Sequence, residues 1–345
     1  MSTDVSLNAL SLRPAGAGIS TYIRELLPAL PEAWQRRLHV HVQADAVEEL
    51  PEAVRATCWP VSSGARRAVR GALLPHGRGL FHSLDVDLPL RSRGPSVVTV
   101  HDLSVFDVPW AFPAGRARAE RVLVRHALWR ADAVLADSHF TADRIRARFG
   151  RDSVVAPLAP PAALRPATAA TMDEVRRRYG VPERFVLYVG TVEPRKDVRM
   201  LAEACRSLDV PLVIAGGAFG PQAPLVGKVQ RLGFVPAADL PALYGLAEVV
   251  GYPSLYEGFG LPPVEALACG AALVCSRVAD LPRVLGEGAA FFEPGDLPGL
   301  TCALNDVWHD EALRNHLVTR GQAAVGRLSW ATTAAITADV YASLA

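Results

Sequence analysis

Short apolar segments that alternate with helical segments constrain the fold of this chain more than any other feature of its sequence. They recur in both halves, at residues 95–102, 132–137, 185–190, 212–217, 247–251 and 272–276. Strands that alternate with helices form parallel sheets that carry helices on both faces. A chain of 345 residues is also long enough for two domains. The sequence therefore predicts an α/β fold of two doubly wound, Rossmann-like domains.

One strand–loop–helix segment, residues 252–270, combines groups that suit a nucleotide. Gly258 and Gly260 let a ligand approach the loop, and the helix that follows begins near two prolines and stops at a glycine. The start of a helix favours anions. Glu257 and Glu265 flank the loop, where carboxylates suit hydroxyl groups rather than the anion itself. A ligand with a phosphate in the middle and hydroxylated rings at both ends is a nucleotide sugar.

Glu257-Gly-Phe-Gly-Leu-Pro, followed by Glu265-Ala-x-Ala-x-Gly, resembles the nucleotide-binding signature of the family 4 retaining glycosyltransferases. The resemblance covers nearly the whole chain and is strongest over residues 186–196 and 252–294. It implies the GT-B fold, in which two Rossmann-like domains face a central cleft. The donor then binds the C-terminal domain and the acceptor mostly the N-terminal one. An ordinary strand–loop–helix with solvated glutamates is the alternative.

A basic loop follows the expected strand at residues 185–190. Its run Thr-Val-Glu-Pro-Arg-Lys-Asp resembles the family's Thr-x-Glu-x-Arg-Lys-Asn, with Asp197 in place of asparagine. Arginine grips a diphosphate with two parallel hydrogen bonds, and lysine adds a point charge. Only two of the 36 basic residues are lysine, so Lys196 stands out. Two solvated loop cations are the alternative.

The resemblance implies a role for each of these groups in a metal-independent transfer. Arg195 and Lys196 neutralise the charge that grows on the departing nucleoside diphosphate. Glu265 accepts hydrogen bonds from the ribose, and Glu257 holds hydroxyls of the donor sugar. The implied catalytic residues are His101, Arg195, Lys196 and Glu257. The implied donor-binding residues are Gly16, Gly18, Gly190, Thr191, Phe234, Val235, Phe259, Gly260, Leu261 and Glu265.

A glycine-rich loop at residues 13–22 joins the first strand to the first helix. The resemblance places Gly16 and Gly18 in this loop against the diphosphate and sugar of the donor. Ser20 and Thr21 depart from the family's pattern, so no side-chain contact is assigned to them. A tight turn without a ligand is the alternative.

His101 stands at the carboxyl end of a buried strand, residues 95–102. Catalytic groups of parallel sheets gather at such strand ends. By resemblance, His101 lies beside the donor sugar. The alternative is a strand-end histidine whose hydrogen bonds are satisfied by Asp102.

Asp85 and Asp87 form an acidic triplet with the valine between them. Glycosyltransferases of the other major fold hold a divalent metal with such a triplet. The signature matched here belongs to a metal-independent fold, so we expect a polar loop end and no metal. We also expect no cofactor apart from the nucleoside-diphosphate sugar as co-substrate, with GDP, UDP and dTDP as open possibilities.

Composition predicts where the domains meet. Residues 157–170 are rich in proline and alanine, which is typical of a linker. We expect an N-terminal, acceptor-side domain at 1–160, a linker at 161–182 and a nucleotide-sugar-binding domain at 183–327. By resemblance, a final helix at 328–345 crosses back onto the N-terminal domain.

Charge and hydropathy limit the kinds of partner that this chain is expected to bind. A net charge of +1 argues against nucleic-acid binding. Because neither a secretory signal nor a run of eighteen apolar residues is visible, we expect a cytoplasmic protein without a transmembrane segment. An arginine-rich helix at 113–130 leaves two interpretations open: a solvated face, or contact with a membrane surface or an acidic acceptor. Nothing else in the sequence supports peripheral membrane contact.

Together these features predict a retaining hexosyltransferase that moves a sugar from a nucleotide donor to a hydroxyl of a glycan or secondary metabolite. The runs His101-Asp-Leu-Ser and Gly190-Thr-x-Glu-Pro-Arg-Lys resemble those of mannosyltransferases and other hexosyltransferases, and this resemblance favours a GDP-sugar. Two alternatives remain. One is another enzyme on the same fold, such as a sugar-nucleotide epimerase or a phosphorylase. The other is a nucleotide-sugar binding protein without activity.

Overall fold

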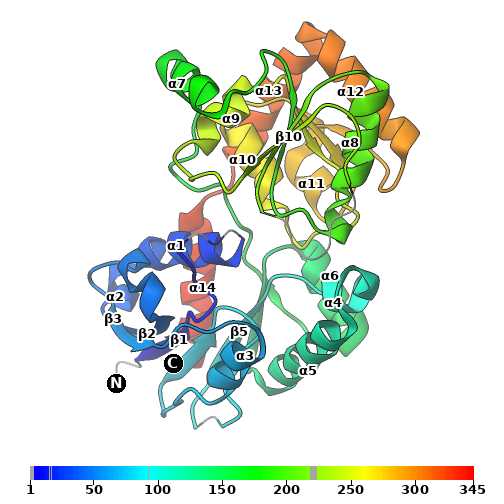
Figure 1. The fold of residues 1–345 in the computed structure, drawn as a ribbon. Coiled ribbons are helices and arrows are strands. Elements are labelled where there is room, and N and C mark those ends of the chain that lie inside the picture. The colour runs from blue at the N-terminus through cyan, green and yellow to red at the C-terminus, as the bar shows by residue number, and fades with distance from the viewer. Residues whose placement is uncertain (1–3, 15, 17, 92, 218–223) are drawn as a thin grey trace. The chain divides into compact units, whose positions relative to one another are not determined.

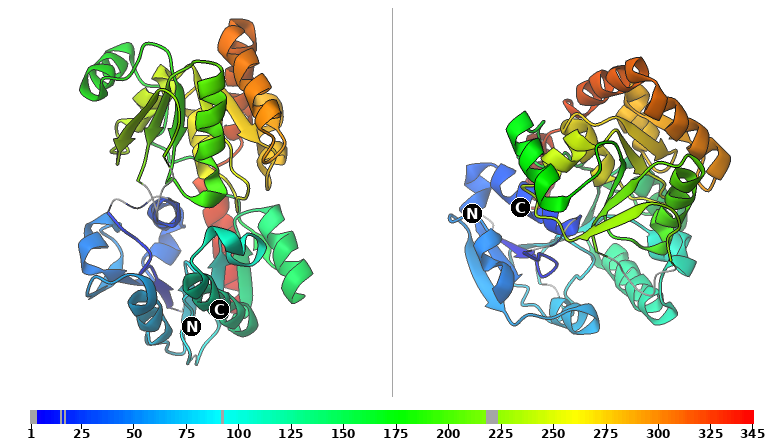
Figure 2. Two further views of the ribbon diagram at one scale, coloured as in Figure 1. Left: turned by 45° about the vertical axis from the view of Figure 1, so that its right-hand side comes forward. Right: turned by 45° about the horizontal axis from the view of Figure 1, so that its top comes forward.

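The computed structural model describes residues 4–14, 16, 18–91, 93–217 and 224–345. These residues form two compact units, each built around its own sheet (Figures 1 and 2). Unit 1 comprises Met1–Leu158 and Ser329–Ala345, and unit 2 comprises Ala159–Leu328. The chain therefore leaves unit 1, builds unit 2 and returns to unit 1 for its last helix.

Unit 1 contains a 7-stranded sheet in the order β3-β2-β1-β4-β5-β6-β7, and every neighbouring pair is parallel. Its strands are β1 (Val5–Asn8), β2 (Leu38–Gln43), β3 (Arg55–Trp59), β4 (Leu80–Ser83), β5 (Ser96–Val100), β6 (Ala133–Ala136) and β7 (Val154–Val155). The order reverses between β1 and β4. In open parallel sheets, ligands bind outside the carboxyl ends of the strands at such a switch point.

The helices of unit 1 cover its sheet. They are α1 (Ile19–Ala29), α2 (Glu32–Gln35), α3 (Gly64–Ala72), α4 (Ser104–Asp107), α5 (Ala114–Arg130), α6 (His139–Phe149) and α14 (Trp330–Leu344), with the 3-10 turns η1 (Ala44–Glu49) and η2 (Pro109–Ala111). The arginine-rich helix α5 buries Val124, Ala127 and Leu128 in the core. Its outer side exposes Val122 and Trp129. The helix therefore buries one apolar side in the core and leaves two large apolar side chains on its outer side.

Helix α14 packs within unit 1 although it follows unit 2 in the chain (Figure 1). The hydroxyl of Tyr341 lies 2.7 Å from Nδ1 of His82 on β4. The hydroxyl of Thr333 donates to the carbonyl of Pro157. These buried polar contacts hold α14 against the sheet and against residue Pro157, where the chain is about to leave unit 1.

Unit 2 contains a 6-stranded parallel sheet in the order β10-β9-β8-β11-β12-β13. Its strands are β8 (Val186–Val189), β9 (Leu212–Ala215), β10 (Val229–Gly233), β11 (Val249–Tyr252), β12 (Leu273–Ser276) and β13 (Ala290–Phe292). The switch point lies between β8 and β11. Helices that follow these two strands lead away in opposite directions, so right-handed crossovers place them on opposite faces of the sheet.

The helices of unit 2 are α7 (Ala169–Tyr179), α8 (Val198–Ser207), α9 (Leu240–Leu246), α10 (Leu261–Ala268), α11 (Leu281–Leu285), α12 (Leu297–His309) and α13 (Glu311–Val325), with η3 (Pro194–Lys196) and η4 (Gly286–Gly288). Helix α12 packs on α8, and α10 packs on α13. The short connection between β9 and β10 lies partly outside the described residues, at 218–223.

The linker expected at residues 161–182 contains a helix. Thr168 caps α7 by accepting a hydrogen bond from the backbone of Thr171, and Gly180 ends it in the left-handed conformation. The helix packs against α9 and buries Val175. Capping signals at both ends make this a helix of unit 2, whereas the prolines before residue 168 keep the preceding segment extended.

Candidate functional site

Two loops meet at the switch point of unit 2 because they follow neighbouring parallel strands. The first, residues 190–197, follows β8, and the second, residues 253–260, follows β11. The backbone N–H of Leu255 donates to the carbonyl of Arg195 at 2.8 Å, which ties one loop to the other. The charged groups predicted from both loops are thereby brought together.

Lys196, Glu257 and Tyr252 form the centre of this site. The ammonium group of Lys196 donates to Oε1 of Glu257 and, at 2.8 Å, to the hydroxyl of Tyr252. That hydroxyl donates in turn to the same carboxylate oxygen at 2.7 Å. All three side chains are buried. A lysine ammonium has three N–H groups, and two of them have these partners among the described residues, so one remains for a ligand.

Arg195 extends the cluster toward the other carboxylate oxygen. Its guanidinium lies 3.4 Å from Oε2 of Glu257 and 2.7 Å from Oε1 of Glu193. It also donates to the carbonyl of Tyr256 at 3.1 Å. The fork of donors is therefore held in one orientation before any ligand arrives.

Within this cluster, the cations and the carboxylate each favour the charged form of the other. Burial by itself would raise the pKa of Glu257, but Lys196 and Arg195 lower it to about 2. Burial also lowers the pKa of Lys196, and the carboxylate of Glu257 opposes that effect. Glu257 is consequently an anion across the physiological pH range, and it holds two cations beside the loops.

Glu265 occupies a different environment on α10. It is half-buried, and its carboxylate accepts a hydrogen bond from the hydroxyl of Tyr244 on α9 at 3.4 Å. Burial raises its pKa to about 7, and that single hydrogen bond only partly offsets the rise. In the part of the chain that the structure describes, Glu265 therefore has few hydrogen-bond donors to stabilise its charge, and hydroxyl groups of a ligand would supply more.

The start of α10 offers fewer N–H donors than the glycine-rich loop suggested. Pro262 and Pro263 stand in its first turn, and proline has no N–H. The N-cap Gly260 has φ 93°, and a Cβ there would meet the side chain of Leu281 at 2.8 Å. Phe259 and Leu261 are buried beside it. An anion at this edge must depend on Arg195 and Lys196 more than on the helix terminus.

The remaining donor-binding candidates of unit 2 line the same sheet edge. Gly190 follows β8, and Gly216 follows β9. A Cβ on Gly216 would lie 2.1 Å from the carbonyl oxygen of Gly190, so the two strand ends approach this closely only because residue 216 is glycine. Thr191 is exposed and Val235 is buried. Phe234 follows β10 and is 62% exposed. An exposed aromatic ring at a ligand-binding edge is suited to stack on a flat heterocycle.

The candidates of unit 1 also lie at the carboxyl edge of their sheet. Gly18, with φ 59°, is the N-cap of α1, and a Cβ on Gly16 would clash with the hydroxyl of Ser20. His101 follows β5, but its partner is not Asp102. Its Nδ1 lies 2.6 Å from the carboxylate of Asp137, whereas Asp102 bonds the backbone and hydroxyl of Ser104.

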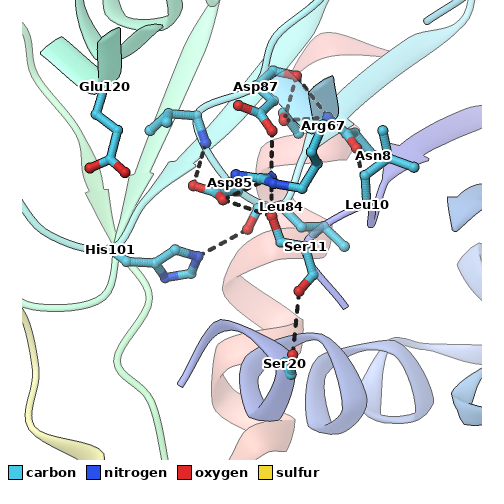
Figure 3. Close-up of polar contacts among 12 residues, drawn as sticks. Asn8, Leu10, Ser11, Ser20, Arg67, Leu84, Asp85, Asp87, His101 and Glu120 are labelled. Carbon is cyan, nitrogen blue, oxygen red and sulfur yellow. Dashed lines mark hydrogen bonds and ion pairs between the residues drawn. The ribbon is translucent and has the colours of Figure 1, made fainter. Parts of the chain in front are cut away.

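The acidic triplet forms an ion-pair cluster at the unit 1 switch point (Figure 3). Arg67 of α3 binds the carboxylate of Asp87 and lies 3.4 Å from that of Asp85. Asp85 also accepts a hydrogen bond from the hydroxyl of Ser11 at 2.7 Å. Both carboxylates therefore face a cation of the chain itself.

Sequence reasoning gave no role to Tyr252, Glu193 or Asp137. Tyr252 and Glu193 lie inside the motifs that drew attention to Glu257 and Lys196, so proximity in sequence was a usable signal. Asp137 is 36 residues from His101, and nothing local marked the pair. Within the described residues, no three His, Cys, Asp or Glu side chains are grouped to hold a metal ion. No helix there is long and apolar enough to cross a bilayer.

Comparison with known proteins relates this chain to enzymes of sugar transfer. Residues 172–324 match the family described as Glycosyl transferases group 1. The chain is 32% identical to the O-antigen chain mannosyltransferase B of Escherichia coli over 281 residues, which are 76% of this chain and 74% of that protein. It spans only about a quarter of three further mannosyltransferases of that organism that it matches.

Solved structures reproduce the fold over the whole chain. Sucrose-phosphate synthase from Thermosynechococcus elongatus superposes with a TM-score of 0.79 at 22% identity and covers 99% of both chains. Anabaena HepE in complex with UDP and glucose also gives 0.79, at 20% identity, with 99% of this chain and 100% of that one covered. Two parallel-sheet α/β units of this kind make up the GT-B fold predicted from the sequence.

Proposed function

Because the chain belongs to the glycosyl transferases group 1 family, we propose that it transfers a hexose from a nucleoside-diphosphate sugar to a hydroxyl acceptor, with retained configuration and without a metal ion. The observation that carries this proposal is the buried cluster of Lys196, Arg195 and Glu257 at the switch point of unit 2. Mannose is the first sugar to test, since the Escherichia coli relative that matches 76% of this chain is named a mannosyltransferase.

The two cations take the part that a metal ion plays in other transferases. As the bond to the sugar breaks, negative charge grows on the departing diphosphate. The remaining N–H of Lys196 and the oriented fork of Arg195 stabilise that charge from fixed positions. Glu257 holds both cations in place and accepts hydrogen bonds from hydroxyls of the sugar with its remaining lone pairs.

Glu265 and Phe234 bind the nucleoside part of the donor. The ribose hydroxyls donate to Glu265, which has one weak hydrogen bond in the free protein, and they lower its raised pKa. The exposed ring of Phe234 stacks on the base. Neither contact selects one base by itself, so GDP, UDP and dTDP donors are all to be tested.

Retention of configuration fits a site without a dedicated base. In a front-face reaction, the departing phosphate takes the proton of the acceptor hydroxyl, so the cations need only stabilise that phosphate. We assign the acceptor to the carboxyl edge of the unit 1 sheet. A reaction with two substrates needs two binding edges, and the switch point of unit 1 is the second one in this chain.

A two-part experiment tests this function. Thermal shifts with GDP, UDP, dTDP and ADP, each with and without EDTA, are expected to show stabilisation by one diphosphate that EDTA leaves unchanged. Proton NMR of the product formed from the matching α-linked mannose or glucose donor and a methyl mannoside is expected to show an α-linkage. Stabilisation that EDTA abolishes would contradict the metal-free site, and a β-linked product would contradict retention. Conversion of the donor to another nucleotide sugar would indicate an epimerase instead.

A further inference from the structure

Both ring nitrogens of His101 are engaged inside unit 1. Nδ1 lies 2.6 Å from the carboxylate of Asp137, which follows β6, and Nε2 lies 2.9 Å from the backbone carbonyl of Leu84. Figure 3 shows the ring at the carboxyl edge of the sheet, directed toward that carbonyl. Strands β5 and β6 are neighbours, so their ends carry these two side chains to one place.

The chemistry of the two partners determines the protonation of the ring. A carbonyl oxygen accepts hydrogen bonds and cannot donate one, and an ionised carboxylate likewise only accepts. A neutral imidazole has one N–H and one bare nitrogen, so it satisfies one of these partners and repels the other. Only the imidazolium form, which has two N–H groups, satisfies both partners at once.

His82, a neighbour on β4, provides the contrast. Its Nδ1 faces the hydroxyl of Tyr341 at 2.7 Å and its Nε2 faces the hydroxyl of Thr99 at 2.8 Å. A hydroxyl either donates or accepts, so a neutral ring satisfies both contacts. Burial lowers the pKa of His82 to about 3. The partners of these two histidines therefore favour different charge states, a neutral ring for the buried His82 and a cation for the partly buried His101.

The surroundings of His101 act on its pKa in both directions. Burial alone would lower its pKa, but Asp137 and, from a greater distance, Asp85 raise it to about 9. Arg67 pairs with Asp85 and lowers the pKa of that carboxyl against the effect of burial, so Asp85 stays ionised. The ring of Tyr22 meets the imidazole edge-on at 5.0 Å, and its hydroxyl lies against Thr99.

We propose that Asp137 is a positioning residue that locks His101 as a doubly protonated cation, so that His101 contributes a fixed positive charge to sugar transfer and never acts as its general base. This inference rests on the proposed function, because it assumes that negative charge develops on the substrates. It goes beyond that function by assigning a role to Asp137 and by excluding proton abstraction by His101.

The charge state is tested first, without any substrate. Histidine ring signals of the wild-type protein are followed by NMR from pH 5 to 10, with His101 assigned by its loss in His101→Gln. His101 is expected to stay protonated beyond pH 8, whereas His82 stays neutral throughout. In Asp137→Asn, the midpoint of His101 is expected to fall by about two units, to near neutral pH. A wild-type midpoint near 6.5, or one that Asp137→Asn leaves unchanged, would overturn the inference.

The role in transfer is tested by the pH dependence of kcat/KM. In Asp137→Asn, the imidazolium ring of His101 is expected to lose one of its two protons near neutral pH. The ratio of variant to wild-type kcat/KM is therefore expected to fall by at least about tenfold between pH 6 and 8.5. Asp137→Glu restores the charge and is expected to restore a flat ratio even at a reduced rate. A ratio that rises with pH would mean that the neutral ring is the active form, which contradicts the proposal.

A matched control separates this effect from general damage. Asp107→Asn removes a different carboxylate of unit 1, which pairs with Arg144 at 2.6 Å. The side chain of Asp107 is almost as buried as that of Asp137. It is expected to leave the pH profile unchanged. If the wild type transfers sugar from no donor, the proposed function fails and the role in transfer fails with it. The NMR titration would still decide whether Asp137 sets the charge of His101.

Discussion

Lys196 and Glu257 form a buried ion pair although 61 positions separate them in the chain. The hydroxyl of Tyr252 bridges them, since it accepts from Lys196 and donates to Glu257. A buried pair of this kind is costly to break, because one partner is then left charged without compensation. The same cluster is therefore expected to govern both the stability of unit 2 and the rate of transfer.

Lys196→Ala is expected to reduce turnover at least tenfold, which corresponds to about 1.4 kcal/mol of lost transition-state stabilisation. It is also expected to lower the free energy of unfolding by roughly 3 kcal/mol, because Arg195, the cation that then remains beside Glu257, is more distant than Lys196. Steady-state kinetics and urea unfolding measure the two effects. The other lysine provides the control: Lys228 pairs with Asp209 on the surface, so Lys228→Ala should change neither quantity.

Replacing both partners separates stability from catalysis. In Lys196→Met with Glu257→Gln no buried charge is left unpaired, so much of the stability lost in Lys196→Ala is expected to return. Turnover is expected to stay at least tenfold below wild type, because the cation that faces the diphosphate is absent. A double variant that recovers both stability and turnover would show that the pair has only a structural role.

Glu265→Gln is expected to make the free protein more stable at pH 8 and to weaken donor binding. A carboxyl whose folded pKa is raised to about 7 loses stability as pH rises from its unfolded value toward 7, and glutamine does not titrate. The gain is expected to be about 1–3 kcal/mol. Loss of charge at the ribose should raise the Kd of the diphosphate about tenfold or more. Glu311→Gln, an exposed change on α13, is the control; equal effects of the two variants would refute the assignment.

Phe234→Ala is expected to weaken nucleotide binding without changing stability. The ring is exposed, so its loss removes little buried surface. Loss of a stacked base costs about 1–3 kcal/mol in other aromatic platforms. Calorimetric titration with the nucleoside diphosphate measures the change, and Phe234→Tyr should keep the affinity. An unchanged Kd in the alanine variant would place the base elsewhere.

The stability of unit 1 is expected to depend on pH through His101. Its folded pKa is raised to about 9, so its contribution is complete below the unfolded value near 6.5 and is lost as pH rises toward 9. The loss is expected to be roughly 3 kcal/mol across that window. Urea unfolding at pH 6.5 and 9 measures it in the wild type. Asp137→Asn should show a much smaller decline, and an equal decline in both proteins would count against the pairing.

The motifs of the C-terminal half made the meeting of Lys196, Arg195 and Glu257 predictable because these residues lie within two short loops. Neighbouring parallel strands bring such loops together, so the sequence alone predicts Lys196 and Glu257 at one edge of a sheet. The partners of those charges could not be predicted in this way. Which oxygen of Glu257 faces Arg195, and that Glu193 shares this arginine, depend on side-chain directions that only the packed loops define.

The alternation of apolar and helical segments by itself determined the two parallel sheets, because each segment has to bury its apolar face against the next layer. Residue types at the strand ends likewise determined which groups could carry chemistry. The tertiary structure alone decided that His101 pairs with Asp137 rather than with the adjacent Asp102. Adjacent residues leaving a strand point in different directions, whereas the ends of neighbouring strands lie side by side however far apart they are in the chain.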